Sequence, residues 1–197
     1  VHDGVMYLPN PRDTTQAIDA ATGDLRWEFR RDVPDDIASY VGGMEDTNRN
    51  LAIYGRLIID TSADDYIYAL DATTGRLAWE TQILDYMTNP ARQSSGPFVA
   101  DGKLISGRSC RPRGGPTACV ITAHDAITGE EVWRTRTIPA PGEPGDETWG
   151  DVPYEERFHV GAWMVPSYDP ALNLIYMGTS VTSPAPKFML GGTDKKH

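Results

Sequence analysis

The chain has 197 residues and a formal net charge of −10, from 28 acidic side chains against 18 lysines and arginines. This balance disfavours a nucleic-acid partner or an anionic membrane surface, because phosphate binding needs a basic face of comparable size. No apolar run approaches the ~20 residues of a membrane span. The chain begins within a strand-like run and stops in a loop at His197, so we expect a piece of a larger protein. A short open solenoid complete in itself is the alternative.

One eleven-residue pattern occurs three times, at 17–27, 69–79 and 123–133, with Asp in its third position, Thr-Gly in its sixth and seventh, and Trp at its end. The tryptophans lie 52 residues (27 to 79) and 54 residues (79 to 133) apart, a spacing that fits one four-stranded sheet plus its loops. A single such sheet cannot bury both faces, so the repeats predict sheets that stack on their neighbours. Three unrelated hairpins, each with a core tryptophan, are the alternative.

The second copy shows the local structure that the pattern predicts. Residues 66–70 alternate as in a strand with one buried face, and Asp71 ends that strand. Thr74-Gly75 predicts a tight turn, because glycine accepts a positive φ. Residues 77–80 then return as the outer strand, where Trp79 presents a large flat face to the gap between two sheets and an N–H to a backbone carbonyl.

The pattern as a whole predicts an all-β fold, a segment of a β-propeller with about three and a half four-stranded blades. The blades span approximately 1–32, 50–84, 94–138 and 160–197, and the last of them is incomplete. No segment shows sustained helical periodicity. Residues 138–146 contain too much Pro and Gly for a helix or a central strand, so we expect a long excursion between the third and fourth blades.

Cys110 and Cys119 lie at either end of a turn-forming segment that joins two strands of the third blade. They can face each other across a hairpin, and a disulfide there indicates an oxidising compartment. Two buried free thiols are the alternative. The chain has no CxxC pair and only four scattered histidines, so no zinc pattern is present.

The repeat and the order of the segments around it resemble the tryptophan-docking blades of the pyrroloquinoline quinone (PQQ) dependent alcohol dehydrogenases, which are eight-bladed periplasmic propellers. Residues 48–52 are similar to the family's Asp-Arg-Gly-Leu-Ala, residues 163–179 to its Trp-Gly-Trp-Tyr segment, and residues 94–97 with 107–109 to the entry of its third blade. The resemblance covers nearly the whole chain. It implies part of an exported enzyme that oxidises an alcohol with bound PQQ and passes electrons to an acceptor such as a cytochrome c. We expect the chain on its own to be inactive.

The resemblance also implies roles for individual residues. Trp163 corresponds to the tryptophan on which the quinone ring lies, and Arg49 to the arginine that binds a cofactor carboxylate. Ser94 and Ser109 correspond to hydroxyl donors at the cofactor's edge. Each has a purely structural alternative: a core tryptophan, a solvated or blade-bridging arginine, and serines that bond to the local backbone.

Several positions depart from the family. The cysteine pair that covers the other face of the quinone falls at Gly43 and Met44, where Met44 can serve as a soft cover. The two metal ligands of the family fall at Pro112 and Val181, neither of which offers the side-chain oxygen that calcium needs. Calcium is therefore doubtful. The catalytic aspartate corresponds to a position beyond His197, so the catalytic residue is unknown.

Arg108, Arg111 and Arg113 surround the position where the metal ligand is missing. We expect guanidinium groups to hold the carboxylates of the cofactor and to stabilise developing negative charge in place of the metal. Arg111 and Arg113 therefore join the predicted cofactor-binding residues. The alternative is that this loop pairs with some of the many surface carboxylates.

Two other functions stay open. The missing metal ligands and cysteine pair also suit a propeller that has lost its active site and serves as a non-catalytic scaffold or binding protein. An enzyme that uses the same pocket without quinone is the third possibility. An aspartate on the axial face of the following blades, together with a signal peptide, favours the quinone enzyme over the scaffold.

Overall fold

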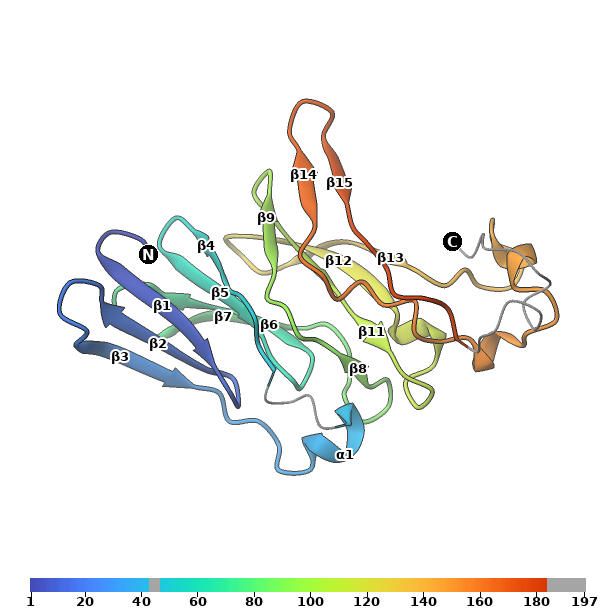
Figure 1. The fold of residues 1–197 in the computed structure, drawn as a ribbon, viewed down its shortest axis with the longest axis horizontal. Helices are drawn as coiled ribbons and strands as arrows, with labels where there is room; N and C mark the ends of the chain where they lie inside the picture. Colours follow the sequence, from blue (N-terminus) through green and yellow to red (C-terminus); the bar gives the residue numbers. More distant parts are fainter. Residues whose placement is uncertain (43–46, 184–197) are drawn as a thin grey trace.

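The structure is a computed structural model that describes residues 1–42 and 47–183, and the fold is all-β as predicted (Figure 1). The first sheet is an antiparallel meander of β1 (Val5–Asn10), β2 (Thr14–Asp19) and β3 (Leu25–Arg30). The second contains β4 (Ala52–Tyr54), β5 (Leu57–Thr61), β6 (Tyr66–Asp71) and β7 (Leu77–Gln82). The third contains β9 (Phe98–Ala100), β10 (Lys103–Gly107), β12 (Val120–Asp125) and β13 (Glu131–Arg136).

Smaller elements complete the described part of the chain. β8 (Ala91–Arg92) pairs with β11 (Ser109–Cys110), and β14 (Ser167–Asp169) pairs with β15 (Leu174–Tyr176) in a projecting hairpin. The helices are short: α1 (Ile37–Val41), which helical periodicity did not predict, and the 3₁₀ turns η1 (Pro116–Ala118), η2 (Asp146–Trp149) and η3 (Tyr154–Glu156). No helix in these residues is long and apolar enough to cross a membrane.

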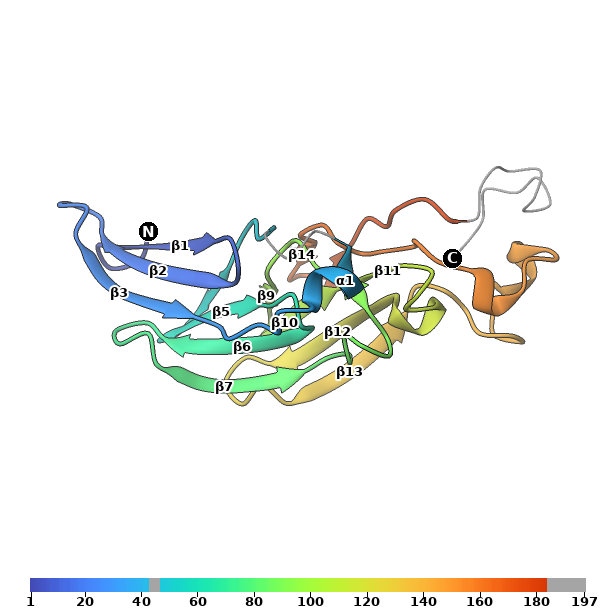
Figure 2. The same cartoon turned by 90° about the horizontal axis from the view of Figure 1, so that it is seen from below.

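The sheets stack face to face in chain order, and Figure 2 shows them following one another along the molecule. Successive side chains of β6 point to opposite faces. Tyr68 and Leu70 pack in the cluster that joins the first and second sheets, whereas Ile67 and Ala69 pack in the cluster that joins the second and third. Ile105 of the third sheet lies in a further cluster against the β14–β15 hairpin. Each interface therefore removes apolar surface from water on both of its sides.

The repeated Asp-x-x-Thr-Gly turns form in the same way in all three sheets. In the second sheet the Asp71 carboxylate accepts hydrogen bonds from the backbone N–H groups of Thr73 and Thr74, both at 3.0 Å. Gly75 has a φ of +69° and donates its N–H to the carbonyl of Asp71 at 2.8 Å. The aspartate thus ends the strand by capping the turn, and the glycine permits the left-handed backbone.

Two of the repeat tryptophans lie on the glycine turn of the next sheet. The indole of Trp27 covers Gly75, where an added Cβ atom would lie 2.6 Å from the ring, and Trp79 covers Gly129 in the same manner. The indole N–H of Trp27 donates to the carbonyl of Ala72 at 2.9 Å. Trp133, on the outer strand of the third sheet, is 38% exposed.

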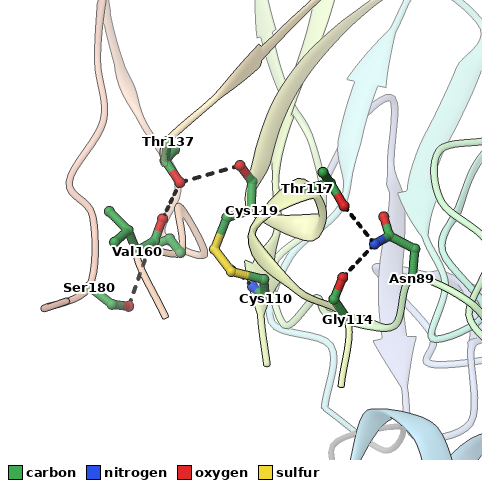
Figure 3. Close-up of a disulfide and its surroundings, with 9 residues drawn as sticks. Asn89, Cys110, Gly114, Thr117, Cys119, Thr137, Val160 and Ser180 are labelled. Atoms are coloured by element: carbon green, nitrogen blue, oxygen red, sulfur yellow. Dashed lines mark hydrogen bonds between the residues drawn. A yellow bond between two sulfur atoms is a disulfide. The ribbon is translucent and has the colours of Figure 1, made fainter. Parts of the chain in front are cut away.

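A disulfide joins Cys110 and Cys119, whose Cα atoms lie 4.6 Å apart (Figure 3). It closes the loop between β10 and β12, but β11 pairs with β8 rather than with β12 as a simple hairpin would require. Thr137 donates its hydroxyl hydrogen bonds to the carbonyls of both Cys119 and Val160. The disulfide loop and the segment that leads to Trp163 are therefore held together.

The predicted excursion between the third sheet and the last hairpin is held by Arg157 and Trp149. The Arg157 guanidinium lies 5.2 Å from the ring centre of Trp149, donates to the Asp146 carboxylate at 2.6 Å and binds the carbonyl of Val152 at 3.1 Å. Trp149 is fully buried in the cluster that also contains the disulfide. The excursion is thus packed against the third sheet, and it ends beside the pocket described next.

Candidate functional site

A pocket of about 310 Å³ opens where five segments of the chain meet, a volume at the lower end of the range for small-molecule sites. Five of the six residues predicted to bind the cofactor line it. These five are Arg49, Ser94, Ser109, Arg111 and Trp163. Three more residues complete the lining of this pocket: Arg92, His159 and Ser180.

One side of the pocket is built where the segment before β4 crosses the segment before β9. Gly96 packs directly on the backbone of Asn50, where any Cβ atom would overlap the Asn50 carbonyl, and its N–H donates to that oxygen at 3.1 Å. This close approach brings Arg49 beside Ser94, and the Arg49 guanidinium donates to the Ser94 carbonyl at 3.1 Å. The glycine is required here because no other residue allows the two backbones to touch.

The opposite side is formed by the irregular segment that precedes β14. Gly161 lies against Ser109, and Gly107 lies against Ala162. Neither glycine has room for a Cβ atom at these contacts. Trp163 follows directly, and its indole N–H donates to the Ser180 hydroxyl at 2.9 Å. The ring keeps 36% of its surface exposed. A fixed ring with an open face suits the stacking of a flat ligand.

Arg49 and Trp163 meet across the pocket, with the guanidinium carbon 5.5 Å from the ring centre. This distance lies within the range of a cation–π contact. The pairing places a positive charge over the aromatic ring, where an anionic group of a ligand in the pocket can be bound.

Arg92 and Arg111 supply two further positive charges. The strand pair β8–β11 sets Arg92 opposite Ser109. Its guanidinium is held by the carbonyls of Val41 and Gly42, each at 2.7 Å. Burial, and next the charge of Arg111, hold the pKa of Arg92 below its usual value. Arg111 directly follows Cys110, which pairs with Ala91, so the two arginines are brought to the same pocket.

Two of the three arginines around Pro112 lie elsewhere. Arg113 is not in the pocket lining: its guanidinium lies 4.2 Å from the ring centre of Tyr40 and donates to the carbonyl of Ser39 at 3.3 Å. Arg108 is fully buried and forms an ion pair with Asp65 at 2.8 Å. The alternative interpretation, pairing with a carboxylate, thus describes Arg108, although that carboxylate is buried rather than on the surface.

The positions that correspond to the family's metal ligands do not form a cation site with the described residues. Pro112 and Val181 are both exposed, and neither side chain carries an oxygen. No three His, Cys, Asp or Glu side chains in the described ranges 1–42 and 47–183 gather as metal ligands. Gly43 and Met44, the positions of the missing cysteine pair, lie outside the described residues.

Sequence reasoning missed Arg92, His159 and Ser180. No motif contains them. Arg92 reaches the pocket through the pairing of β8 with β11, His159 lies at the end of the excursion, and Ser180 accepts the hydrogen bond of the Trp163 indole. His159 has a φ of +72°, which is rare outside glycine and directs the chain from the excursion into the Gly161 contact. A positive φ at a non-glycine residue often marks a functional site, but the sequence does not reveal it.

The chemistry of the lining is one-sided. Three guanidinium groups, three hydroxyls, an imidazole and an indole face the pocket, and none of the residues described there is acidic. In a chain of net charge −10 such a group of cations is unexpected for a surface depression. Guanidinium forks bind carboxylates and the indole binds a flat ring, so the donor set fits a planar aromatic ligand with several carboxylates, such as PQQ.

Comparison with known proteins agrees with this chemistry. The model of the PQQ-dependent glucose/ethanol/alcohol dehydrogenase family, β-propeller domain, matches residues 1–196. The chain belongs to this family. It is 32% identical to the dehydrogenase subunit of a quinone alcohol dehydrogenase of Komagataeibacter europaeus, and the alignment covers 93% of the chain but 27% of that relative.

Two solved structures of the PQQ dehydrogenase class match the whole chain. The quinohemoprotein alcohol dehydrogenase ADHIIG of Pseudomonas putida HK5 superposes with a TM-score of 0.85 and 31% identity, and the chain covers 30% of it. A europium-containing methanol dehydrogenase superposes with a TM-score of 0.83 and 26% identity, and the chain covers 37% of it. The chain thus spans about a third of these structures, and its sheets have the arrangement of part of a PQQ dehydrogenase propeller.

Proposed function

We propose that the pocket binds PQQ and that this chain is part of an enzyme that oxidises an alcohol. The observation that carries the proposal is the convergence of Arg49, Ser94, Ser109, Arg111 and Trp163 from distant segments on one pocket without acidic residues. Residues with only local structural roles have no reason to meet in this way.

The proposed roles follow from the chemistry of each group. Trp163 carries the quinone ring on its open face, and its hydrogen bond to Ser180 fixes the plane of that face. Arg49 and Arg111 bind carboxylates, while the hydroxyls of Ser94 and Ser109 donate to polar atoms at the ring edge. Both serine side chains are nearly buried, so their hydroxyls are held at the wall rather than in bulk water.

Bound PQQ would supply the acceptor for the two electrons that leave the alcohol. The residues of this chain bind and orient the ring, keep water from its bound face and hold its charge. The catalytic base is expected beyond His197, and no described residue is assigned to that role.

The wider assignments rest on the relatives. We propose a primary or secondary alcohol as substrate, an external acceptor such as a cytochrome c, and a periplasmic or otherwise exported location, which the disulfide favours. We also propose that Trp27, Trp79 and Trp133 act as docking residues between blades. A non-catalytic scaffold or binding protein is the alternative, and three clustered arginines without carboxylates favour a pocket that still binds an anionic ligand.

PQQ titration of the natural full-length protein tests the proposal. Trp163→Ala should weaken PQQ binding by about 1–3 kcal/mol through lost stacking and packing. Trp133→Ala is the control, since it removes the same side chain at a position outside the pocket lining. The control should bind PQQ with wild-type affinity. Failure of the wild-type protein to bind PQQ, or a folded Trp163→Ala variant with undiminished affinity, contradicts the proposal.

A further inference from the structure

Arginines outside the pocket commonly have a carboxylate partner. Seven of them form ion pairs, both on the surface and in the core: Arg26, Arg31, Arg56, Arg108, Arg134, Arg136 and Arg157. The three pocket arginines differ. Among the described residues Arg49 and Arg92 donate hydrogen bonds only to backbone carbonyls, and Arg111 has no side-chain hydrogen bond or ion pair.

The Arg92–Arg111 pair is the centre of this unbalanced charge. Arg92 cannot turn away, because its Nε and Nη2 atoms are fixed by the carbonyls of Val41 and Gly42. Arg111 lies on the segment that follows Cys110, whose backbone is anchored by the disulfide and by the pairing of β11 with β8. Two like charges held together at a partly buried surface repel each other unless an anion lies between them.

The same pair makes the pocket unsuitable for a divalent cation. A Ca²⁺ or lanthanide ion needs several oxygen ligands, and the only side-chain oxygens in the described lining are serine hydroxyls, with no carboxylate. The guanidinium charges would also repel such an ion at close range. Pro112 and Val181, at the positions that correspond to metal ligands in the family, add no oxygen from their side chains.

We propose that Arg92 and Arg111 bind the carboxylates of the quinone directly and take the place of a divalent cation, so that PQQ binds to this protein without calcium or a lanthanide. This inference rests on the proposed function and extends it from the identity of the ligand to the means by which its charge is balanced. Arg49 remains the contact on the Trp163 side of the pocket.

The test is a PQQ titration of the natural full-length apoprotein, followed by tryptophan fluorescence or equilibrium dialysis, after exhaustive treatment with a chelator. The dissociation constant should be the same within about twofold when calcium is added back. Arg111→Gln should raise it about ten- to a hundredfold, which corresponds to the loss of one charge-assisted contact. Arg111→Lys, which keeps the charge but loses the fork, should restore part of the affinity.

Arg113→Gln is the matched control, because it removes the same charge two residues away, where the guanidinium lies over Tyr40 and outside the pocket. It should leave the dissociation constant unchanged. Added salt should weaken binding to the wild type and to Arg113→Gln more steeply than binding to Arg111→Gln, because each direct ionic contact contributes to the salt dependence. Thermal melting of each variant verifies that it is folded.

The outcomes separate the two proposals. A wild-type protein that binds PQQ only with added calcium, or a folded Arg111→Gln variant that binds PQQ as the wild type does, overturns the replacement of the cation and leaves PQQ binding itself intact. A wild-type protein that binds no PQQ with or without calcium overturns the proposed function and this inference together.

Discussion

Trp27 and Trp163 show how the stacked sheets and the pocket use the same side chain differently. Trp27 lies on Gly75 of the neighbouring sheet, donates its N–H to a backbone carbonyl, and has the ring of Tyr7 at 5.8 Å. The ring of Trp163 is fixed by a serine hydroxyl, and its surface is 36% exposed at the pocket. One indole joins two parts of the protein, and the other offers its face to a ligand.

The arginines repeat this contrast within three residues of the chain. Arg108 is fully buried and paired with Asp65, and its Nη1 also donates to Ser106 at 2.7 Å. Arg111 lies at the pocket without a carboxylate partner among the described residues. Loss of a group between the sheets should therefore lower stability, whereas loss of a pocket group should lower affinity. The predictions below test that division.

The largest effect is expected for Arg108→Met, which leaves the buried Asp65 carboxylate without its partner. Breaking a buried ion pair on one side costs about 3–5 kcal/mol of unfolding free energy. Burial raises the pKa of Asp65 while Arg108 opposes that rise, so the loss should be smaller at low pH, where the carboxyl group takes up a proton. Urea unfolding at pH 5 and pH 8 measures the loss of unfolding free energy and its dependence on pH.

Arg56→Met is the control for that variant. Arg56 also pairs with an aspartate, at 2.9 Å, but its side chain is 78% exposed. Exposed pairs contribute about 0–1 kcal/mol. Equal losses for the two variants would show that burial does not determine the value of these pairs.

Trp27→Ala should cost about 2–4 kcal/mol, because it removes a partly buried indole from the interface and one of the two hydrogen bonds that the Ala72 carbonyl accepts. The affinity for PQQ should stay that of the wild type, since Trp27 is remote from the pocket lining. Denaturant unfolding and PQQ titration of the same preparation test both halves. A variant of wild-type stability with weakened PQQ binding would reverse the assignment of the two tryptophans.

Much of the fold is readable from the sequence because its signals are local. The Asp-x-x-Thr-Gly turn contains its own capping carboxylate and its own left-handed glycine, so each copy fixes one hairpin without help from distant residues. Residues 66–70, predicted as a strand, form most of β6. By contrast, residues 163–166, at the start of the predicted fourth blade, form no strand, and the two residues before them, Gly161 and Ala162, pack against Ser109 and Gly107.

The site is only partly readable, since its geometry depends on long-range contacts. Motifs located Trp163 and Arg49 because both lie in segments with a recognisable pattern. The direction of the chain after Cys110 is set by the disulfide and by η1, and it carries Arg113 towards Tyr40 rather than into the pocket. Arg92 enters the pocket through the pairing of β8 with β11. Each of these strands has only two residues, which is too short for a recognisable sequence pattern.

Removal of the disulfide should cost about 2–3 kcal/mol, the value expected when a loop of this length is no longer closed in the unfolded chain. The double variant Cys110→Ala with Cys119→Ala should show this loss in urea. Thiol titration of oxidised, denatured wild type should find no reactive group from this pair. A reductant should lower the stability of the wild type and leave the double variant unchanged. Two reactive thiols in protein made in an oxidising compartment would contradict the prediction.

The smallest effect is a pH dependence above neutrality that originates between the sheets. Burial, with a smaller contribution from nearby Asp13, raises the pKa of Asp60 from 3.8 to about 8, although the Asn48 amide and the Thr61 N–H both donate to its oxygens at 2.8 Å. Burial lowers the pKa of His124 from 6.5 to about 4, against the attraction of Glu131. The two groups therefore act in opposite directions.

Between about pH 4 and pH 6.5 the folded state holds an extra proton on Asp60, and the unfolded state holds one on His124, so their contributions to the slope cancel. Above pH 6.5 only the Asp60 contribution remains of these two, and stability falls as pH rises towards 8. We expect a loss of about 1–2 kcal/mol between pH 6.5 and pH 8, which Asp60→Asn should remove. His124→Gln should instead leave the stability falling with pH from about pH 4 upwards. Urea unfolding at half-unit pH intervals measures these slopes. If the slope above pH 6.5 is the same in the wild type and in Asp60→Asn, another group titrates there. The buried Asp65, whose pKa is also raised, is the first candidate.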